Sequence, residues 1–214
     1  MANAECGMNN TGDKQTRVGG VVLCGGESRR MGRPKAWLRI GDEFLLPRVV
    51  RIIGHVVAPV VVATRRGLEL PPIPPNTEVV CDADGAAGPL AGMAAGFDAL
   101  FGRCDAALVA ACDHALLSSA FVRRMIDLLT DHDAVVPEQG GWLFPTVALY
   151  RLKTRALLGA QLAAGELRAQ EFAARCEVRR ATAADFADID RNLDSLRNIN
   201  TPDDFSEILR MASA

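Results

Sequence analysis

The sequence predicts an α/β protein: a single domain of three layers, α/β/α, in which a Rossmann-like, mainly parallel (mixed) sheet has helices on both faces. Short β-branched, apolar runs alternate with segments of helical spacing over most of the chain. The length of 214 residues suits one domain. With 49% hydrophobic residues, the chain can fill a core without disulfides or a structural metal.

The first half of the chain is predicted to contain four strands and two helices. Val18 to Cys24 is a buried apolar run that ends in a glycine-rich loop. Pro47 suits the first turn of a helix, and the prolines between 71 and 75 exclude regular structure. The predicted order is strand 18–24, helix from 47, strand 56–63, strand 78–81, helix 90–100 and strand 106–112.

The second half is predicted to alternate in the same way. Ser118 or Ser119 can cap a helix over 121–129, and Thr201 can cap a last helix that begins at Pro202. Between them we expect strands 134–137 and 143–150 joined by a Gly140-Gly141 turn, helices 154–164 and 167–176, and a strand over 177–180. Residues 1–17 are polar and are interpreted as a flexible tail, which leaves 18–214 as the domain.

Composition excludes several classes of function. A net charge of −2 argues against nucleic-acid or anionic-membrane binding. No apolar run approaches the roughly 18 residues of a spanning helix, and no signal peptide is visible, so we expect a soluble, cytoplasmic protein. The three histidines are scattered, which argues against a zinc cluster. The cysteines lack CxxC spacing and are interpreted as reduced thiols, each a small buried hydrophobic group: Cys6, Cys24, Cys81, Cys104, Cys112 and Cys176.

The loop that follows the first strand has the composition of a phosphate-binding loop. Gly25 and Gly26 allow the backbone to approach a phosphate and to point N–H groups at it. Arg30 and Lys35 add positive charge that can stabilise a reacting polyphosphate. The spacing matches neither a Walker loop nor GxGxxG. A basic turn with solvated arginines is the alternative, but the closing lysine after a buried strand favours phosphate.

Asp113 is the candidate metal ligand. It ends the predicted strand 106–112, and a carboxylate at the carboxyl end of such a strand points into the ligand crevice. Mg²⁺ takes one or two carboxylates together with substrate phosphates. Helix capping is the alternative role, for which Ser118 and Ser119 are better placed. His114 is interpreted as a solvated loop histidine rather than as a neighbour of the metal.

The segment Leu23–Lys35 resembles the signature of the molybdenum cofactor guanylyltransferases, written roughly LAGGxSxRMGxxK. These are nucleotidyltransferases with a glycosyltransferase-A-like fold. Cys24 replaces the usual alanine. Residues 88–93 resemble the second motif, GPLAG, and 198–202 resemble the NxNTP ending. Ala115 departs from the proline of the family's CDxPxL segment, and Phe144 departs from the histidine of its HPxxALY segment.

The resemblance implies a set of site residues. Lys35, Arg30 and Asp113 would be catalytic, with Mg²⁺ on Asp113. Asn198, Asn200 and Arg168 would contact the second substrate, although the asparagines also suit a turn. At Gly88 and Gly92, one helical turn apart, nucleotide contact is preferred over close packing against the sheet. The nucleotide-binding residues would be Leu23, Cys24, Gly25, Gly26, Lys35, Asp82, Gly88, Gly92 and Asp113.

The expected function is guanylyl transfer from GTP to the phosphate of molybdopterin, with release of pyrophosphate. The Leu-x-Gly-Gly form favours GTP over CTP. Two alternatives stay open. The first is a nucleotidyltransferase with another acceptor, such as a sugar phosphate, or one that transfers CMP to the pterin. The second is a non-catalytic nucleotide-binding regulatory protein, which the departures at Ala115 and Phe144 favour. Docking to other enzymes of cofactor biosynthesis, or to target enzymes, is also left open.

Overall fold

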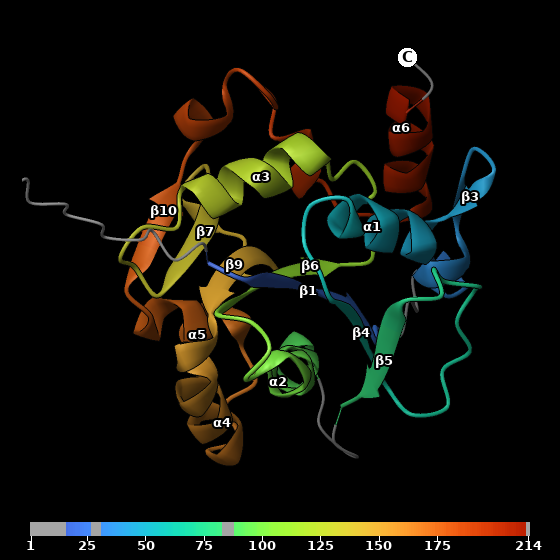
Figure 1. The fold of residues 1–214 in the computed structure, drawn as a ribbon. Helices are drawn as coiled ribbons and strands as arrows, with labels where there is room; N and C mark the ends of the chain where they lie inside the picture. Colours follow the sequence, from blue (N-terminus) through green and yellow to red (C-terminus); the bar gives the residue numbers. More distant parts are fainter. Residues whose placement is uncertain (1–15, 27–30, 83–87, 213–214) are drawn as a thin grey trace, which may run out of the picture.

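The computed structural model describes residues 16–26, 31–82 and 88–212, and these build the predicted three layers (Figure 1). An eight-stranded sheet forms the middle layer, in the order β10-β7-β9-β6-β1-β4-β5, with β8 paired to β7. Only β9 and β8 run antiparallel to their neighbours. The strands are β1 (Val18–Cys24), β4 (Val60–Thr64), β5 (Thr77–Cys81), β6 (Ala106–Ala111), β7 (Ala134–Gln139), β8 (Trp142–Leu143), β9 (Val147–Arg151) and β10 (Val178–Ala181).

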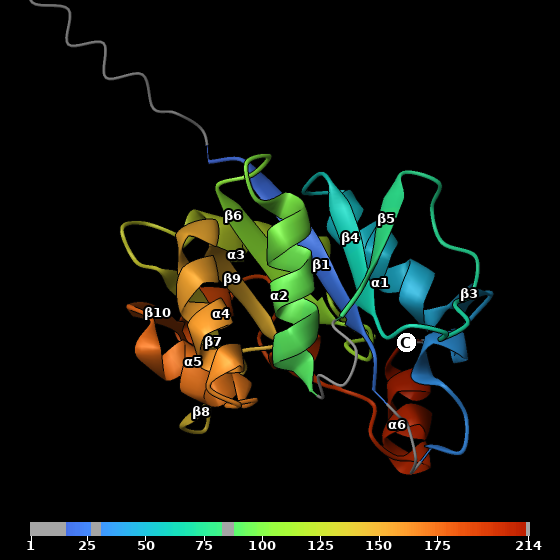
Figure 2. The same cartoon turned by 90° about the horizontal axis from the view of Figure 1, so that it is seen from below.

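Helices cover both faces of this sheet, as predicted (Figures 1 and 2). One face packs against α1 (Leu45–Gly54) and α3 (Ser119–Asp127). The other packs against α2 (Pro89–Leu100), α4 (Arg155–Ala163) and α5 (Ala169–Arg175). The central strand β1 is buried on both sides, because Val22 faces the first group of helices and Val21 the second. This explains its unbroken apolar sequence.

A third, smaller core lies beside the sheet. Helix α6 (Pro202–Ala212) packs there against a short hairpin of β2 (Arg39–Ile40) and β3 (Glu43–Phe44) through Ile208, Leu38 and Ile40. The hairpin was not predicted, because two-residue strands carry too little pattern. Short 3₁₀ turns η2 (Lys35–Trp37), η3 (Leu152–Thr154), η4 (Ala183–Phe186) and η5 (Asp194–Leu196) complete the described chain.

Two predicted strands are shorter than expected. The strand predicted over 56–63 begins only at Val60, because the Val57 N–H still donates to the Ile53 carbonyl at the end of α1. The strand predicted over 143–150 is divided into β8 and β9 around Pro145, which has no N–H to donate. Helix α1 starts at Leu45, which places Pro47 inside its first turn.

The strand order defines where a ligand can bind. The chain passes from β1 to β4 and β5 on one side, and then returns to place β6 on the other side of β1. In open α/β sheets, ligands bind outside the carboxyl ends of the strands at such a switch point. No described helix is long and apolar enough to cross a membrane. The predicted tail falls mainly on residues 1–15, outside the described ranges, so that boundary stays a prediction.

Candidate active site

The site lies at the carboxyl ends of β1 and β6, where the glycine loop and Asp113 leave the sheet side by side. The Cys112 N–H donates to the Leu23 carbonyl at 2.9 Å, so the two strands stay paired up to the residue before Asp113. Gly25 and Gly26 follow β1 directly. Two segments 90 residues apart in sequence therefore meet at the edge that the topology indicates.

Lys35 joins three of the predicted site segments. Its ammonium Nζ lies 2.7 Å from the Asp113 Oδ2 and 3.0 Å from the Asn200 Oδ1. The side chains of Lys35 and Asp113 are only 17% and 15% exposed. The turn η2 fixes the lysine backbone, because the Leu38 N–H donates to the Lys35 carbonyl. A cation, a carboxylate and an amide thus converge in a partly desolvated place, where charges act strongly.

The second oxygen of Asp113 points elsewhere. Its Oδ1 is buried and has no hydrogen-bond partner among the described residues. A buried carboxylate oxygen without a donor is costly, and it is a candidate to bind a cation. No group of three or more His, Cys, Asp and Glu side chains in the described ranges is arranged to hold a metal.

His114 is not the solvated histidine that we expected. Only 3% of it is exposed, and its Nε2 lies 3.9 Å from the Asp113 Oδ1. Burial lowers the pKa of His114, opposed by the nearby Asp113 charge and by backbone hydrogen bonds to Ser195 and Arg197. The prediction failed because this cover comes from a segment eighty residues further along the chain.

That covering segment, 194–200, is held from both ends by aspartates. The Asp190 carboxylate accepts the N–H groups of Asp194 and Ser195, at 2.8 and 3.0 Å. Carboxylates that accept several backbone N–H groups fix a loop firmly. The segment therefore presents a defined surface to the site.

At its far end the segment runs into α6. The Asp204 carboxylate accepts the N–H groups of Asn200 and Thr201, and the Thr201 hydroxyl accepts the Asp204 N–H at 3.2 Å. Thr201 therefore caps α6 as predicted. The Ile199 N–H donates to the Asp113 carbonyl at 3.2 Å. Ile199 is buried between exposed Asn198 and Asn200, so both amides face away from the core.

The described part of the glycine loop, Gly25 and Gly26, is open and close to Asp82. A Cβ placed on Gly25 would lie 3.9 Å from the Arg65 nitrogen and 4.0 Å from the Asp82 Oδ2, and one on Gly26 would meet nothing within 4 Å. Asp82 directly follows β5, and its N–H donates to the Thr64 carbonyl at 2.9 Å, so it lies beside the end of β4. Arg30 lies outside the described residues, so its predicted place in the site is untested.

A row of small side chains lies beneath this loop. Cys24, Cys112 and Thr64 are buried at the ends of three adjacent strands. The thiols of Cys24 and Cys112 are hydrogen-bonded to each other, and this contact together with burial raises the pKa of Cys112 well above its usual value. Both thiols are small buried groups, as predicted, whereas the prediction of burial is wrong for Cys81, which is exposed on the outer strand β5. The Thr64 Oγ1 has no hydrogen-bond partner among the described residues.

The two glycines of the second motif differ in their surroundings. At Gly92 the structure shows close packing rather than a bare helix face, because a Cβ there would lie 3.1 Å from the Leu23 side chain and 3.6 Å from Ala63. Gly88 begins α2 with φ 98°, a left-handed conformation that favours glycine. A Cβ there would lie 3.6 Å from the Leu167 carbonyl.

The predicted second-substrate residues come from two separate segments of the chain. Arg168 precedes α5, its side chain is exposed, and its nearest charged partner is Glu171 at 3.7 Å. Arg168 therefore lies at the end of the 165–168 loop, in which the Leu167 carbonyl is close to Gly88. Two polar groups of the site had not been singled out: the Thr64 hydroxyl, for which the sequence holds no signal, and the Asp204 clamp, which the Thr-x-x-Asp spacing could have indicated.

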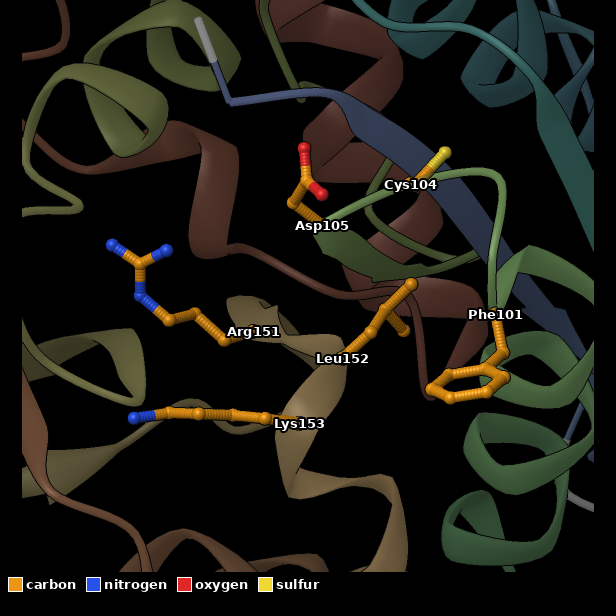
Figure 3. Close-up of a pocket in the computed structure, with 6 residues that line it drawn as sticks. All are labelled: Phe101, Cys104, Asp105, Arg151, Leu152 and Lys153. Carbon is orange, nitrogen blue, oxygen red and sulfur yellow. The ribbon is translucent and has the colours of Figure 1, made fainter. Parts of the chain in front are cut away.

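A pocket elsewhere on the molecule is separate from this site (Figure 3). It lies where β6 begins and the antiparallel β9 ends, which is at the amino ends of the parallel strands, opposite to the candidate active site. Its charged side chains are engaged within the protein: Arg151 donates to the His132 carbonyl, and Lys153 pairs with Asp133. It is lined by Phe101, Cys104, Asp105, Arg151, Leu152 and Lys153.

Residues 20–179 match the family described as the MobA-like NTP transferase domain. A protein from Pelotomaculum thermopropionicum, named probable molybdenum cofactor guanylyltransferase, is 32% identical over 200 residues, covering 90% of this chain and 92% of that protein.

Two solved structures share the fold. One is the molybdopterin-guanine dinucleotide biosynthesis protein A of Archaeoglobus fulgidus, with a TM-score of 0.72 and 22% identity over 91% of this chain and 98% of that chain. The other is a Mycobacterium tuberculosis protein in complex with manganese, with a TM-score of 0.63 and 16% identity over 91% of this chain and 99% of that one.

Proposed function

Because the chain belongs to the MobA-like NTP transferase family, we propose that it transfers GMP from GTP to the phosphate of molybdopterin and releases pyrophosphate. The observation that carries this proposal is the convergence at Lys35. One ammonium group contacts both Asp113 and Asn200, at 2.7 and 3.0 Å, beside the glycine loop. The side chains that would meet a nucleotide triphosphate and those that would meet an acceptor thus share one cation.

The nucleotide would lie across the ends of β1 and β4. In this arrangement the backbone of Leu23 to Gly26 faces the guanine and the phosphates, and Gly25 leaves the gap to Asp82 free of side chain. Lys35 faces the phosphates, and Arg30 is assigned the same role from the sequence alone. Fixed N–H groups and cations stabilise the charge that builds during phosphoryl transfer.

The residues present fit a magnesium ion bound mainly by substrate. Asp113 offers one buried oxygen that has no donor among the described residues, while its other oxygen is occupied by Lys35. Mg²⁺ commonly takes one or two carboxylates and completes its shell with phosphate oxygens and water. When bound, such an ion would neutralise charge on the triphosphate.

The protein residues then act by position and charge, without a covalent intermediate. An oxygen of the acceptor phosphate bonds to the α-phosphorus of GTP, while the bond from that phosphorus to the bridging oxygen breaks and its electron pair leaves with pyrophosphate. Lys35 holds positive charge near both reactants. Asn198 and Asn200 present amides that donate and accept hydrogen bonds, which suits a phosphate or a pterin edge.

The test is an assay of purified protein with GTP, Mg²⁺ and molybdopterin. We expect pyrophosphate release that depends on all three, together with formation of molybdopterin guanine dinucleotide. CTP, ATP and UTP in place of GTP should give much slower release. Omitting the acceptor measures background hydrolysis.

Three outcomes would contradict the proposal. Equal turnover with CTP would contradict the assignment of GTP as the nucleotide. Turnover only with a sugar phosphate would contradict the assignment of molybdopterin as the acceptor. GTP binding without pyrophosphate release, in the presence of active molybdopterin, would favour a regulatory protein instead.

A further inference from the structure

Trp142 is the most exposed large hydrophobic side chain in the described ranges, at 76%. It opens β8, directly after the turn that follows β7, and pairs with Gln139. The rings of the described residues form several stacked, edge-on and cation–π contacts, and Trp142 takes part in none of these. Exposing an indole to water is unfavourable, so covering its face with a flat ligand would be favourable.

The strand register places Trp142 at the height of the active site. Leu149 of β9 pairs with Leu108 of β6 and also with Val135 of β7. Both strands run antiparallel to β9, so β6 and β7 advance together toward the same edge of the sheet. Four residues further on, Cys112 and Gln139 are therefore level.

Since Trp142 pairs with Gln139, its backbone is level with the residue that precedes Asp113. The sideways distance across the sheet between the backbones of Trp142 and Cys112 is at most two strand spacings, about 10 Å. Figure 2 shows β8 on the side of the molecule where α2 begins, which is the side of the glycine loop. An indole at this position is within reach of a ligand that is anchored at Asp113 and extends along the sheet edge.

The side chain also has a defined direction. Leu143 packs into the core on the side of α2, α4 and α5. Successive side chains of a strand point to opposite faces, so Trp142 points to the side of α1 and α3. Leu196 is buried in the core on that same side, and the exposed amides of Asn198 and Asn200 follow it.

We propose that Trp142 is a specificity-determining residue for the acceptor, and that its indole stacks on the pterin ring of molybdopterin. This rests on the proposed function. An aromatic face binds any flat heterocycle, and the amides of Asn198 and Asn200 can bond to the ring edge. The guanine is assigned to the opposite flank, at β1, so the ring near Trp142 belongs to the acceptor.

The test compares Trp142→Ala and Trp142→Phe with wild type in steady-state assays. For Trp142→Ala we expect the KM for molybdopterin to rise about tenfold or more, with the KM for GTP within twofold of wild type. Trp142→Phe should restore most of the affinity, because it keeps an aromatic face. Phe101→Ala is the matched control, since Phe101 is also exposed (57%) but lies in the pocket at the opposite edge.

Fluorescence gives a second readout. The chain has two tryptophans, so Trp37→Phe leaves Trp142 as the only tryptophan, and its emission can be excited without exciting tyrosine. Its emission should change on adding molybdopterin and stay constant on adding GTP.

An unchanged KM for molybdopterin in Trp142→Ala, or an equal rise in the KM for GTP, would overturn the inference and leave the proposed function intact. A wild-type protein that does not use molybdopterin at all would overturn both.

Discussion

Lys35 contacts Asp113 and Asn200 at once, so one side chain connects segments that are 78 and 165 residues away from it. In a site with low exposure, such a cation contributes more than a solvated lysine would. In the proposed reaction, the relative positions of these three residues decide whether the nucleotide and the acceptor meet in line.

Removing either charge at this point should slow the reaction severely. We expect Lys35→Ala and Asp113→Asn each to lower kcat by about 10²- to 10³-fold, because each removes a group that stabilises the developing charge. Circular dichroism should show an unchanged fold. Lys153→Ala serves as the control, since that lysine pairs with Asp133 at the other edge. Wild-type kcat in either site variant would remove the assignment.

His114 gives the protein a stability that depends on pH. Burial lowers its pKa in the folded state, so the unfolded chain binds a proton more readily. The stabilisation is complete above the unfolded-state pKa of about 6.5 and is lost as the pH falls below it. Below pH 6.5, His114→Gln should flatten the fall in unfolding free energy, by up to about 1.4 kcal/mol per pH unit.

Urea unfolding at several pH values measures this slope. His55→Gln is the matched control, because His55 is exposed at the end of α1. Equal slopes in wild type and His114→Gln would show that His114 does not titrate as inferred.

The packing of α2 against the sheet depends on glycines at the positions that face β1. A Cβ on Gly96 would lie 2.4 Å from the Val21 side chain on β1, whereas one on Gly159 in α4 would meet nothing within 4 Å. The glycines of α2 thus let the helix approach the sheet closely.

Gly96→Ala and Gly159→Ala should therefore change stability in opposite directions. The first forces a buried β-branched neighbour to move and should cost about 1–3 kcal/mol of unfolding free energy. The second gains helix propensity in open space and should add about 0.5–1 kcal/mol. Denaturant titration decides, and two changes of the same sign would contradict the packing described for α2.

The elements also show what the sequence pattern can predict. β1 matches its predicted range, because a polar segment before it and a glycine-rich loop after it define both ends of the apolar run. The strand over 56–63 was predicted too long, since Val56 and Val57 carry strand propensity but are still bonded to the end of α1. Tertiary context overrides propensity at such boundaries.

The site residues that directly follow a strand could be predicted from the sequence. The parts of the site that are covered by a segment distant in the sequence could not. Asp113 and Gly25 could be placed from the strand pattern alone. The burial of His114 and the Asn200 contact depend on the segment 194–200, whose path has no periodic signal. Trp142 carries no motif, and only the register of the four strands β6, β9, β7 and β8 relates it to Asp113.

At the scale of the whole molecule, nucleotide binding should stabilise the fold. A ligand that binds only the folded chain adds about 2.7 kcal/mol at a hundred times its Kd. We expect GTP with Mg²⁺ to raise Tm by several degrees in wild type, and chelation by EDTA to reverse most of the shift. Asp113→Asn should lose the magnesium-dependent part. A shift of equal size with EDTA present would argue against a metal at Asp113.

The Lys35–Asn200 contact has a consequence for the order in which the protein matures. Chains leave the ribosome from the amino end, so the glycine loop and Asp113 emerge well before residue 200. Until the last helix has been synthesised and docked, Lys35 lacks one of its partners and His114 lacks its cover. We therefore expect a nascent chain to join donor and acceptor only after Asn200 has reached Lys35 and α6 has docked.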